Sequence, residues 1–288
     1  MARLLTETDR WSKRRQRTEE LKERWPFALE VLTFYGRLLD VQERVYAATC
    51  EDAPPPEAVV AYVAERVSPR VIEVSVADGP AALAGAVLER FHECDVSEYV
   101  GGWLRGDDLD SVARYLARSA AGPVLEALGP AAGAACTGPR DERHCPTCGG
   151  LPQLSYFASS REDLVTAHRY LQCSRCATTW AYPRLTCAAC GENDTAKLAV
   201  YGEVGTTQAE LSGGVIKPAP ARAAPETNAQ FPHLRIDGCE TCAHYVLSVD
   251  LDRDGRAVPL VDEIAAIPLD LYATERGMSK IVPNLMGF

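Results

Sequence analysis

The chain has 288 residues, of which 47% are hydrophobic and 24% charged, and this composition excludes a mostly disordered or collagen-like protein. Its net charge is −10, divided equally at residue 140: 17 basic against 22 acidic residues before the division and 13 against 18 after it. Because phosphate contacts require a basic surplus, we expect no nucleic-acid partner. The sequence has no run of 18 apolar residues and no signal-peptide core at its start, so we expect a cytoplasmic protein without membrane insertion.

The first 120 residues are predicted to be helical. From Arg17 to Ala48, apolar residues recur mostly at spacings of three and four, which indicates one stripe of an amphipathic helix that Pro26 interrupts early. Further helices are expected over residues 57–67, 80–94 and 107–118. The breaks between them are expected at Ser68-Pro69, Asp78-Gly79-Pro80 and Gly101-Gly102.

Residues 119–140 are rich in Ala, Gly and Pro and are predicted to form a linker, with at most a short helix over 123–128. Short strands are expected after it, over residues 151–157, 168–173, 179–184, 196–202, 233–238 and 244–251. Residues 202–230 are expected to be an irregular excursion, and residues 262–277 have helical spacing with a break at Pro268. The predicted domains are residues 1–140, 141–186, 187–260 and a helical tail, 261–288.

Eight of the eleven cysteines form four Cys-x-x-Cys pairs, and all of them follow residue 140. A disulfide framework is not expected in a reducing cytoplasm, so the cysteines favour metal binding. Two such pairs supply the four thiolates of one tetrahedral site, and four pairs therefore predict two sites. The predicted metal ligands are Cys145, Cys148, Cys173, Cys176, Cys187, Cys190, Cys239 and Cys242.

The residue after each pair indicates which pairs belong together. Glycine follows the first and third pairs, and alanine follows the second and fourth, so the pattern CxxCG…CxxCA occurs twice in tandem. We therefore pair 145/148 with 173/176 and 187/190 with 239/242, while a cross-brace of first with third and second with fourth remains an alternative. Each unit would be a small ribbon that depends on its metal for folding free energy. The fold class is α+β, an all-α domain followed by two rubredoxin-like or zinc-ribbon-like domains.

Spacing alone does not choose between zinc and iron, because both accept four sulfur ligands in a tetrahedron. Base rates for four-cysteine ribbons favour zinc. A thioredoxin-like dithiol catalyst is disfavoured, because that chemistry needs one motif at a helix N-terminus. His144 and His244 flank cysteine pairs and are alternative donors, although eight cysteines already fill two sites.

Several stretches of the sequence resemble the FdhE family of formate dehydrogenase accessory proteins. The resemblance includes HCPTCGGLPQLSYF at 144–157, RYLQCSRCATTWAYPRLTCAACG at 169–191, IDGCETCAHYVLSVDLDRDG at 236–255 and the tail at 261–285. Residues 17–42 are also similar to the helical start of that family. This resemblance implies a helical domain followed by two rubredoxin-like domains, with iron bound by the cysteine pairs.

The resemblance further implies a cytoplasmic factor that assembles respiratory formate dehydrogenase by acting on its catalytic subunit before export. The sequence shows no nucleophile elbow, P-loop or dinucleotide fingerprint, so we expect no enzymatic activity. Two other functions are weighed against this one. A rubredoxin-like redox carrier would need iron in its sites, and a zinc-ribbon nucleic-acid module is disfavoured by the acidic charge.

Overall fold

The computed structural model describes residues 7–159, 167–203, 216–218 and 229–287. It divides into two compact units. The helical unit consists of Met1–Leu151 together with Cys173–Thr178 and Leu285–Gly287. The sheet unit consists of Pro152–Gln172 and Thr179–Asn284. The domain boundaries expected at residues 140, 187 and 261 stay predictions.

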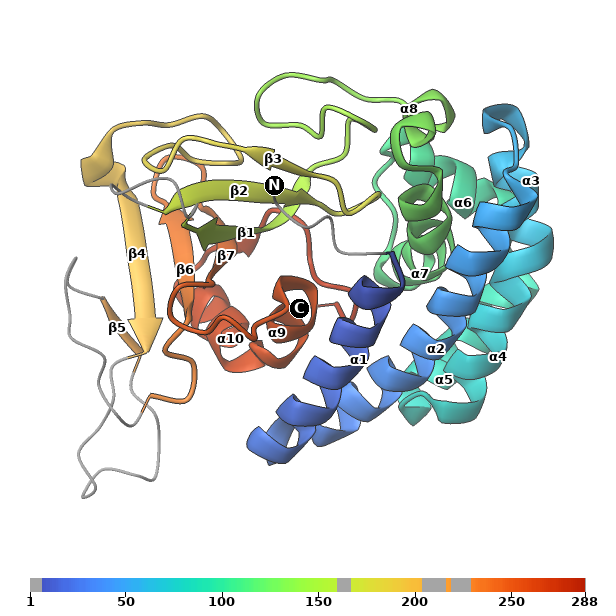
Figure 1. The fold of residues 1–288 in the computed structure, drawn as a ribbon, viewed down its shortest axis with the longest axis horizontal. Helices are drawn as coiled ribbons and strands as arrows, with labels where there is room; N and C mark the ends of the chain where they lie inside the picture. The colour runs from blue at the N-terminus through green and yellow to red at the C-terminus, as the bar shows by residue number, and fades with distance from the viewer. Residues whose placement is uncertain (1–6, 160–166, 204–215, 219–228, 288) are drawn as a thin grey trace. The chain divides into compact units, whose positions relative to one another are not determined.

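The helical unit is built around α2, which packs against α1, α4 and α7 (Figure 1). Its core consists of apolar side chains with almost no exposure, including Leu21, Leu32, Leu38, Leu39, Leu116 and Leu125. The helices are α1 (Glu7–Arg24), α2 (Leu29–Asp52), α3 (Val59–Tyr62), α4 (Ser68–Asp78), α5 (Ala81–Glu93), α6 (Val96–Arg105), α7 (Ser111–Leu128) and α8 (Ala132–Ala135). The expected break at Pro26 is a short 3₁₀ helix, Pro26–Ala28, between α1 and α2.

Two of the expected helix breaks are wrong. At Ser68-Pro69 the chain stays helical, because a π-helical turn over Val63–Val67 leads directly into α4 and Pro69 occupies its first turn, where proline is tolerated. Gly101 and Gly102 lie inside α6, a helix that the sequence analysis missed. A Cβ atom on Gly102 would lie 3.2 Å from Leu109 Cδ2, so the missing side chain permits close packing here.

The predicted linker at 119–140 is also wrong over much of its length. Helix α7 continues to Leu128 with Pro123 inside it, and a 3₁₀ turn and α8 follow. The helix survives its proline because Ala120, Ala121, Val124 and Leu125 are fully buried against the rest of the unit. Tertiary packing of small side chains therefore outweighs the local Ala/Gly/Pro signal.

The sheet unit contains one sheet with the strand order β3-β2-β1-β7-β6-β4-β5 among the described residues, and β8 pairs with β7 (Figure 1). The strands are β1 (Pro152–Ala158), β2 (His168–Cys173), β3 (Thr179–Ala181), β4 (Leu198–Glu203), β5 (Ile216–Pro218), β6 (Leu234–Cys239), β7 (His244–Asp250) and β8 (Ser279–Lys280). Strands β6 and β7 are antiparallel, whereas β1 pairs with β7 in parallel, with Leu154 opposite Leu247. Strands from both expected ribbons thus share hydrogen bonds in one sheet.

The strands lie close to their expected positions, and the expected irregular segment at 202–230 lies mostly outside the described residues. The predicted helical tail is confirmed as α9 (Pro259–Ala265) and α10 (Ile267–Glu275), which pack on β1, β6 and β7. They separate at Ala266, and Pro268 occupies the first turn of α10 rather than breaking a helix.

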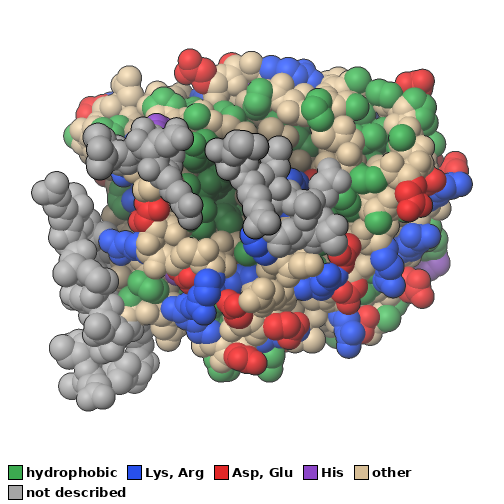
Figure 2. All heavy atoms as spheres, in the orientation of Figure 1, with side chains coloured by type: hydrophobic (Ala, Val, Ile, Leu, Met, Phe, Trp, Pro, Cys, Tyr) green, Lys and Arg blue, Asp and Glu red, His purple; other side chains and the backbone are tan. Residues whose placement is uncertain are grey.

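None of the described helices combines the length and the apolar character that crossing a membrane requires. On the face drawn in Figure 2, basic and acidic side chains are interspersed, and neither sign dominates a large area.

Candidate metal centres

Within the described residues, two groups of four cysteine sulfurs converge, and in each group all sulfurs lie within 4.8 Å of one another. In the first quartet, Cys145, Cys148, Cys173 and Cys176, the Sγ–Sγ distances are 3.6 Å for 145–176 and 3.3 Å for 148–173. In the second quartet, Cys187, Cys190, Cys239 and Cys242, the 187–242 and 190–239 distances are both 3.8 Å. These are the groupings that the tandem pairing predicts, not those of a cross-brace. That they bind metal stays a prediction.

The first and third Cys-x-x-Cys pairs form the same tight turn. In the first quartet, Cys145 N–H donates to the Gly150 carbonyl at 2.9 Å, and Gly149 N–H donates back to the Cys145 carbonyl at 2.9 Å. The same reciprocal bonds join Cys187 to Glu192 and Gly191. Gly149 and Gly191 have φ values of +72° and +82°, a region that glycine enters without steric cost.

The second and fourth pairs also end on a left-handed residue, but here it is alanine. Ala177 has φ +56° and Ala243 has φ +55°. Each carries a Cβ atom that this conformation disfavours, so the surrounding structure has to hold it there. The repeated CxxCG…CxxCA pattern therefore corresponds to four chain reversals, each with a residue of positive φ. In each quartet, two of these reversals direct four sulfurs toward one point.

The sulfur geometry fits a tetrahedral metal ion and excludes disulfides. A metal–sulfur bond of about 2.3 Å in a regular tetrahedron separates the sulfurs by about 3.8 Å. The observed separations of 3.3–3.8 Å are close to this value and far longer than the S–S bond of about 2.05 Å. Backbone N–H groups also point at the sulfurs, from Arg175 to Cys173 Sγ at 3.3 Å and from Ala189 to Cys187 Sγ at 3.4 Å. Such donors stabilise a thiolate and tune the metal that it binds.

The protonation of the quartets favours a cation. Burial raises the pKa of Cys173 in the first quartet and of Cys187 in the second, because a thiolate loses solvation in an apolar environment. Hydrogen bonding, chiefly with Cys148, lowers the pKa of Cys145. Four neighbouring thiolates can coexist only when a bound cation compensates their charge.

The two quartets differ in exposure. All four cysteines of the first quartet are buried, and all four belong to the helical unit. In the second quartet, within the sheet unit, Cys190 is exposed and Cys242 is half-buried. The first site is therefore closed, as structural sites are, whereas solvent and exchanging ligands can reach the second.

Two residues beside the first quartet were missed by the sequence analysis. Arg175, between Cys173 and Cys176, is buried and donates from Nη1 to the Thr137 carbonyl at 3.0 Å. This bond anchors the turn that carries the second cysteine pair, which we call the knuckle. Cys136 is buried beside Cys148, and hydrogen bonding with Cys148 lowers the pKa of Cys136. Neither residue carries a sequence signal, because Cys136 belongs to no pair and Arg175 occupies one of the two positions that the Cys-x-x-Cys pattern leaves unspecified.

Neither flanking histidine is part of a quartet. His144 Nδ1 lies 2.6 Å from Asp141 Oδ1, and His244 Nδ1 lies 2.7 Å from the Cys242 carbonyl oxygen. Each imidazole is thus oriented by a neighbouring oxygen, and the four-sulfur groups do not need it as a donor.

Comparison with known proteins finds the same family in the segment that carries the first quartet and in the segment that carries Cys239 and Cys242 of the second. Residues 144–184 match the family model described as "FdhE, central domain", and residues 222–286 match "FdhE, C-terminal domain". A protein described as "Protein FdhE homolog" from Aquifex aeolicus is 31% identical over 147 residues, which cover 51% of this chain and 42% of that protein. One from Pseudomonas aeruginosa is 31% identical over 142 residues, covering 49% of this chain and 38% of the relative.

The matched segment thus spans about two-fifths of the length of these relatives. A solved structure, "The crystal structure of the FdhE protein from Pseudomonas aeruginosa", aligns with a TM-score of 0.60 at 22% identity and covers 96% of this chain and 94% of that chain. The structural likeness shows a shared fold. At the sequence level, the similarity to the FdhE family lies in residues 144–184, which contain the first quartet, and in residues 222–286, which contain Cys239 and Cys242 of the second.

Proposed function

We propose that this protein is a non-enzymatic accessory factor that binds the immature catalytic subunit of a respiratory formate dehydrogenase in the cytoplasm. The observation that carries the proposal is the match of residues 144–184, with the whole first quartet, and of residues 222–286, with two cysteines of the second, to the central and C-terminal domains of the FdhE family. The helical and sheet units would together offer the surface that holds the subunit during its assembly.

In this proposal each quartet binds one metal ion, iron or zinc, through its four thiolates. Iron in such a site can change oxidation state, whereas zinc only holds the ligands in place. The protein itself supplies the fixed sulfur positions, the backbone N–H groups that donate to Cys173 and Cys187, and the burial that restricts access to the first quartet.

Co-purification tests the proposal. We expect the tagged chain, expressed in cells that make respiratory formate dehydrogenase, to retain the catalytic subunit before its export. Cys148→Ser should reduce this retention, because loss of one thiolate weakens the first site and loosens its knuckle. Cys50→Ser is the matched control, since Cys50 is exposed and lies outside both quartets. Absence of the subunit from the parent chain's complexes, in cells shown to make it, would refute the proposal.

A second candidate function, a rubredoxin-like redox carrier, is favoured by the exposure of Cys190. An exposed sulfur ligand brings the second site within reach of an electron-transfer partner. This function requires iron, so protein purified without oxygen should show charge-transfer bands on oxidation and lose them on reduction. Colourless protein that contains zinc in both sites would exclude the carrier and leave the assembly factor.

A further inference from the structure

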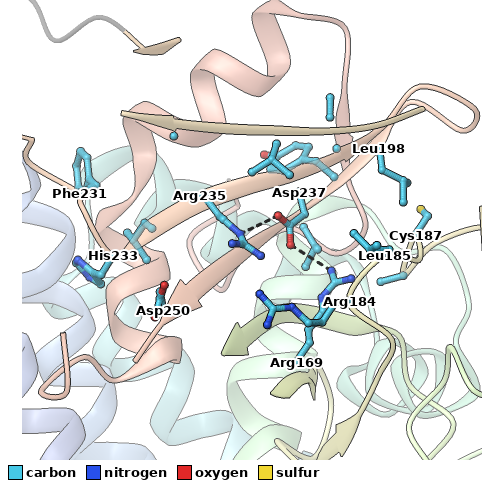
Figure 3. Close-up of a pocket in the computed structure, with 18 of the residues that line it drawn as sticks. Arg169, Arg184, Leu185, Cys187, Leu198, Phe231, His233, Arg235, Asp237 and Asp250 are labelled. Atoms are coloured by element: carbon cyan, nitrogen blue, oxygen red, sulfur yellow. Dashed lines mark hydrogen bonds and ion pairs between the residues drawn. The ribbon is translucent and has the colours of Figure 1, made fainter. Parts of the chain in front are cut away.

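A cavity of about 550 Å³ lies in the sheet unit, beside β4 and β6 and the loop that precedes Cys187. Its size is in the range of pockets that hold a small molecule or a few residues of a peptide. Figure 3 shows the side chains of Arg169, Arg184 and Arg235 lying around Asp237. Nothing in the proposed metal chemistry uses these arginines, and their clustering in a cavity calls for a separate explanation.

Arg169 is a fixed part of the cavity floor. Its side chain is buried, and it donates to the Thr186 carbonyl at 2.9 Å and to Ser155 Oγ at 3.3 Å. Its Nη2 also lies 3.4 Å from Asp237 Oδ2. The donors of Arg169 are therefore engaged by the protein, and its charge is shared with Asp237.

Arg184 and Arg235, in contrast, keep donors for a ligand. Arg235 uses Nε to bind Asp237 Oδ1 at 3.0 Å, which leaves its two terminal amino groups. Within the described residues, Arg184 donates only to the Ala167 carbonyl, at 2.9 Å, and forms no ion pair with a carboxylate. The exposed Arg184 is thus a positive charge that the surrounding described residues do not neutralise.

The acidic residues of the cavity do not supply that missing partner. Asp237 is shared by Arg169 and Arg235, and Ser248 Oγ donates to it at 2.6 Å. The other two carboxylates are also engaged, Asp250 with Arg253 at 3.6 Å and Glu203 with the Phe231 N–H at 2.7 Å. The cavity therefore carries four arginines against three carboxylates, and the surplus lies at Arg184.

The two available guanidinium groups are held in place by one aromatic ring. The Cζ atoms of Arg235 and Arg184 lie 4.0 Å and 5.1 Å from the centroid of the Phe157 ring. Stacking of this kind restricts the planar groups before a ligand arrives, so less conformational entropy is lost on binding. Planar guanidinium forks suit carboxylates, which they can bind through two parallel hydrogen bonds.

Part of the cavity lining is apolar and exposed to solvent. Leu185 is 63% exposed and Val200 is 38% exposed, and both line the cavity with Leu198. A bare inorganic anion would leave this apolar surface in water. A ligand that carries an apolar group next to its negative charge would bury it.

We propose that this cavity binds a carboxylate attached to an apolar group, with Arg184 and Arg235 holding the carboxylate and Leu185 and Val200 covering the apolar part. Two kinds of ligand combine a carboxylate with an apolar group in this way: a peptide with an acidic residue next to leucine, and a free aliphatic carboxylic acid. The proposal does not depend on formate dehydrogenase being the client, because it rests only on the residues of the cavity.

Titration calorimetry on the whole chain tests the site with four probes: acetyl-Leu-Glu-Leu-amide, its Gln analogue, hexanoate and inorganic phosphate. We expect the Glu peptide or hexanoate to bind, and the neutral Gln peptide to bind at least about tenfold more weakly than the Glu peptide, because it lacks the charge that makes guanidinium hydrogen bonds strong. Binding of the Glu peptide assigns a peptide source, and binding of hexanoate alone assigns a free acid. Equal affinity for the Glu and Gln peptides, or binding of phosphate alone, would overturn the proposal.

The variants separate the site from general charge effects. Arg184→Gln should lower the affinity for the bound probe by about tenfold or more. The fold should stay intact, because Arg184 is exposed. Arg256→Gln is the matched control, an exposed arginine of the same unit that does not line the cavity, and it should bind like the parent. Unchanged affinity in Arg184→Gln would refute the proposed role of the cavity, whatever the outcome of the co-purification experiment.

Discussion

At the residue scale, each sulfur pair depends on the single residue that follows it. Gly149 and Ala177 both have positive φ, and Gly149 also lies against another part of the backbone. A Cβ atom on Gly149 would be 2.9 Å from the carbonyl carbon of Gly138, closer than real Cβ contacts occur. The glycine after the first pair is thus required by space as well as by φ, whereas the alanine after the second pair is tolerated at a conformational cost.

We therefore expect Gly149→Ala to be the most damaging substitution of its type. The left-handed conformation alone costs alanine about 1–2 kcal/mol, and the contact with Gly138 adds to this. Gly277→Ala is the control, since Gly277 has φ +75° with open space around it and should show the conformational cost alone. Urea unfolding at fixed metal concentration measures both, and equal losses in the two variants would contradict the steric contribution.

The reverse substitution, Ala177→Gly, should be slightly stabilising. It relieves about 1–2 kcal/mol of left-handed strain and costs about 0.5–1 kcal/mol of backbone entropy, so the net gain is about 0–1.5 kcal/mol. The same unfolding experiment measures it. A loss of stability in Ala177→Gly would mean that the Ala177 methyl group contributes packing that outweighs its strain.

At the element scale, α9 and α10 each place a buried carboxylate beside a lysine of the sheet. The side chain of Lys280 in β8 is 3% exposed, and its Nζ lies 2.7 Å from Glu263 Oε1 of α9 and 3.1 Å from Asp270 Oδ1 of α10. Asp270 also accepts a hydrogen bond from the Tyr245 hydroxyl at 2.7 Å, and burial raises the pKa of Tyr245. A single ammonium group thus compensates two carboxylates where α9, α10 and β8 meet.

We expect Lys280→Met to lower the free energy of unfolding by about 3–5 kcal/mol, because it leaves two buried carboxylates without a counter-charge. Lys197→Met is the matched control. Lys197 is 49% exposed and pairs with Glu192 at 3.5 Å, so its removal should cost less than about 1 kcal/mol. Chemical unfolding of both variants makes the comparison. Similar stability of Lys280→Met and the parent would contradict the stabilising role assigned to this ammonium group.

The sequence predicts elements well where a local pattern decides the structure and poorly where packing decides it. Strands β1, β2, β6 and β7 were expected because turns and cysteine pairs bound them on both sides. The extent of α7 was not, because burial of its alanines overrides a composition typical of linkers. The parallel pairing of β1 with β7 joins segments far apart in the chain, and no local periodicity encodes such a partner.

The candidate quartets could be predicted almost completely, because two-residue spacers and the Gly/Ala repeat are local features. Arg175 and Cys136 could not. Arg175 acquires its role from the Thr137 carbonyl, and Cys136 from its proximity to Cys148, contacts that only the folded chain creates.

At the scale of the whole molecule, the two quartets belong to different units and have different access to solvent. The helical unit has its own apolar core, with Leu32, Leu38 and Leu125 fully or almost fully buried, so its helices do not depend on metal for burial. Metal loss is therefore expected to loosen the knuckles while leaving most of the helical content in place.

This difference predicts that a chelator removes the two metal ions at different rates. In protein loaded with two zinc ions, the exposed Cys190 lets a competing ligand attack the second site, whereas the first is closed by burial of all four cysteines. Zinc release followed with a chromophoric chelator should thus be biphasic, and circular dichroism should show largely retained helicity. Cys190→Ser should abolish the fast phase and Cys148→Ser the slow one, whereas the control Cys50→Ser should keep both. Loss of the slow phase in Cys190→Ser would assign slow release to the second quartet. Burial of the cysteines would then not be what limits the rate of metal release.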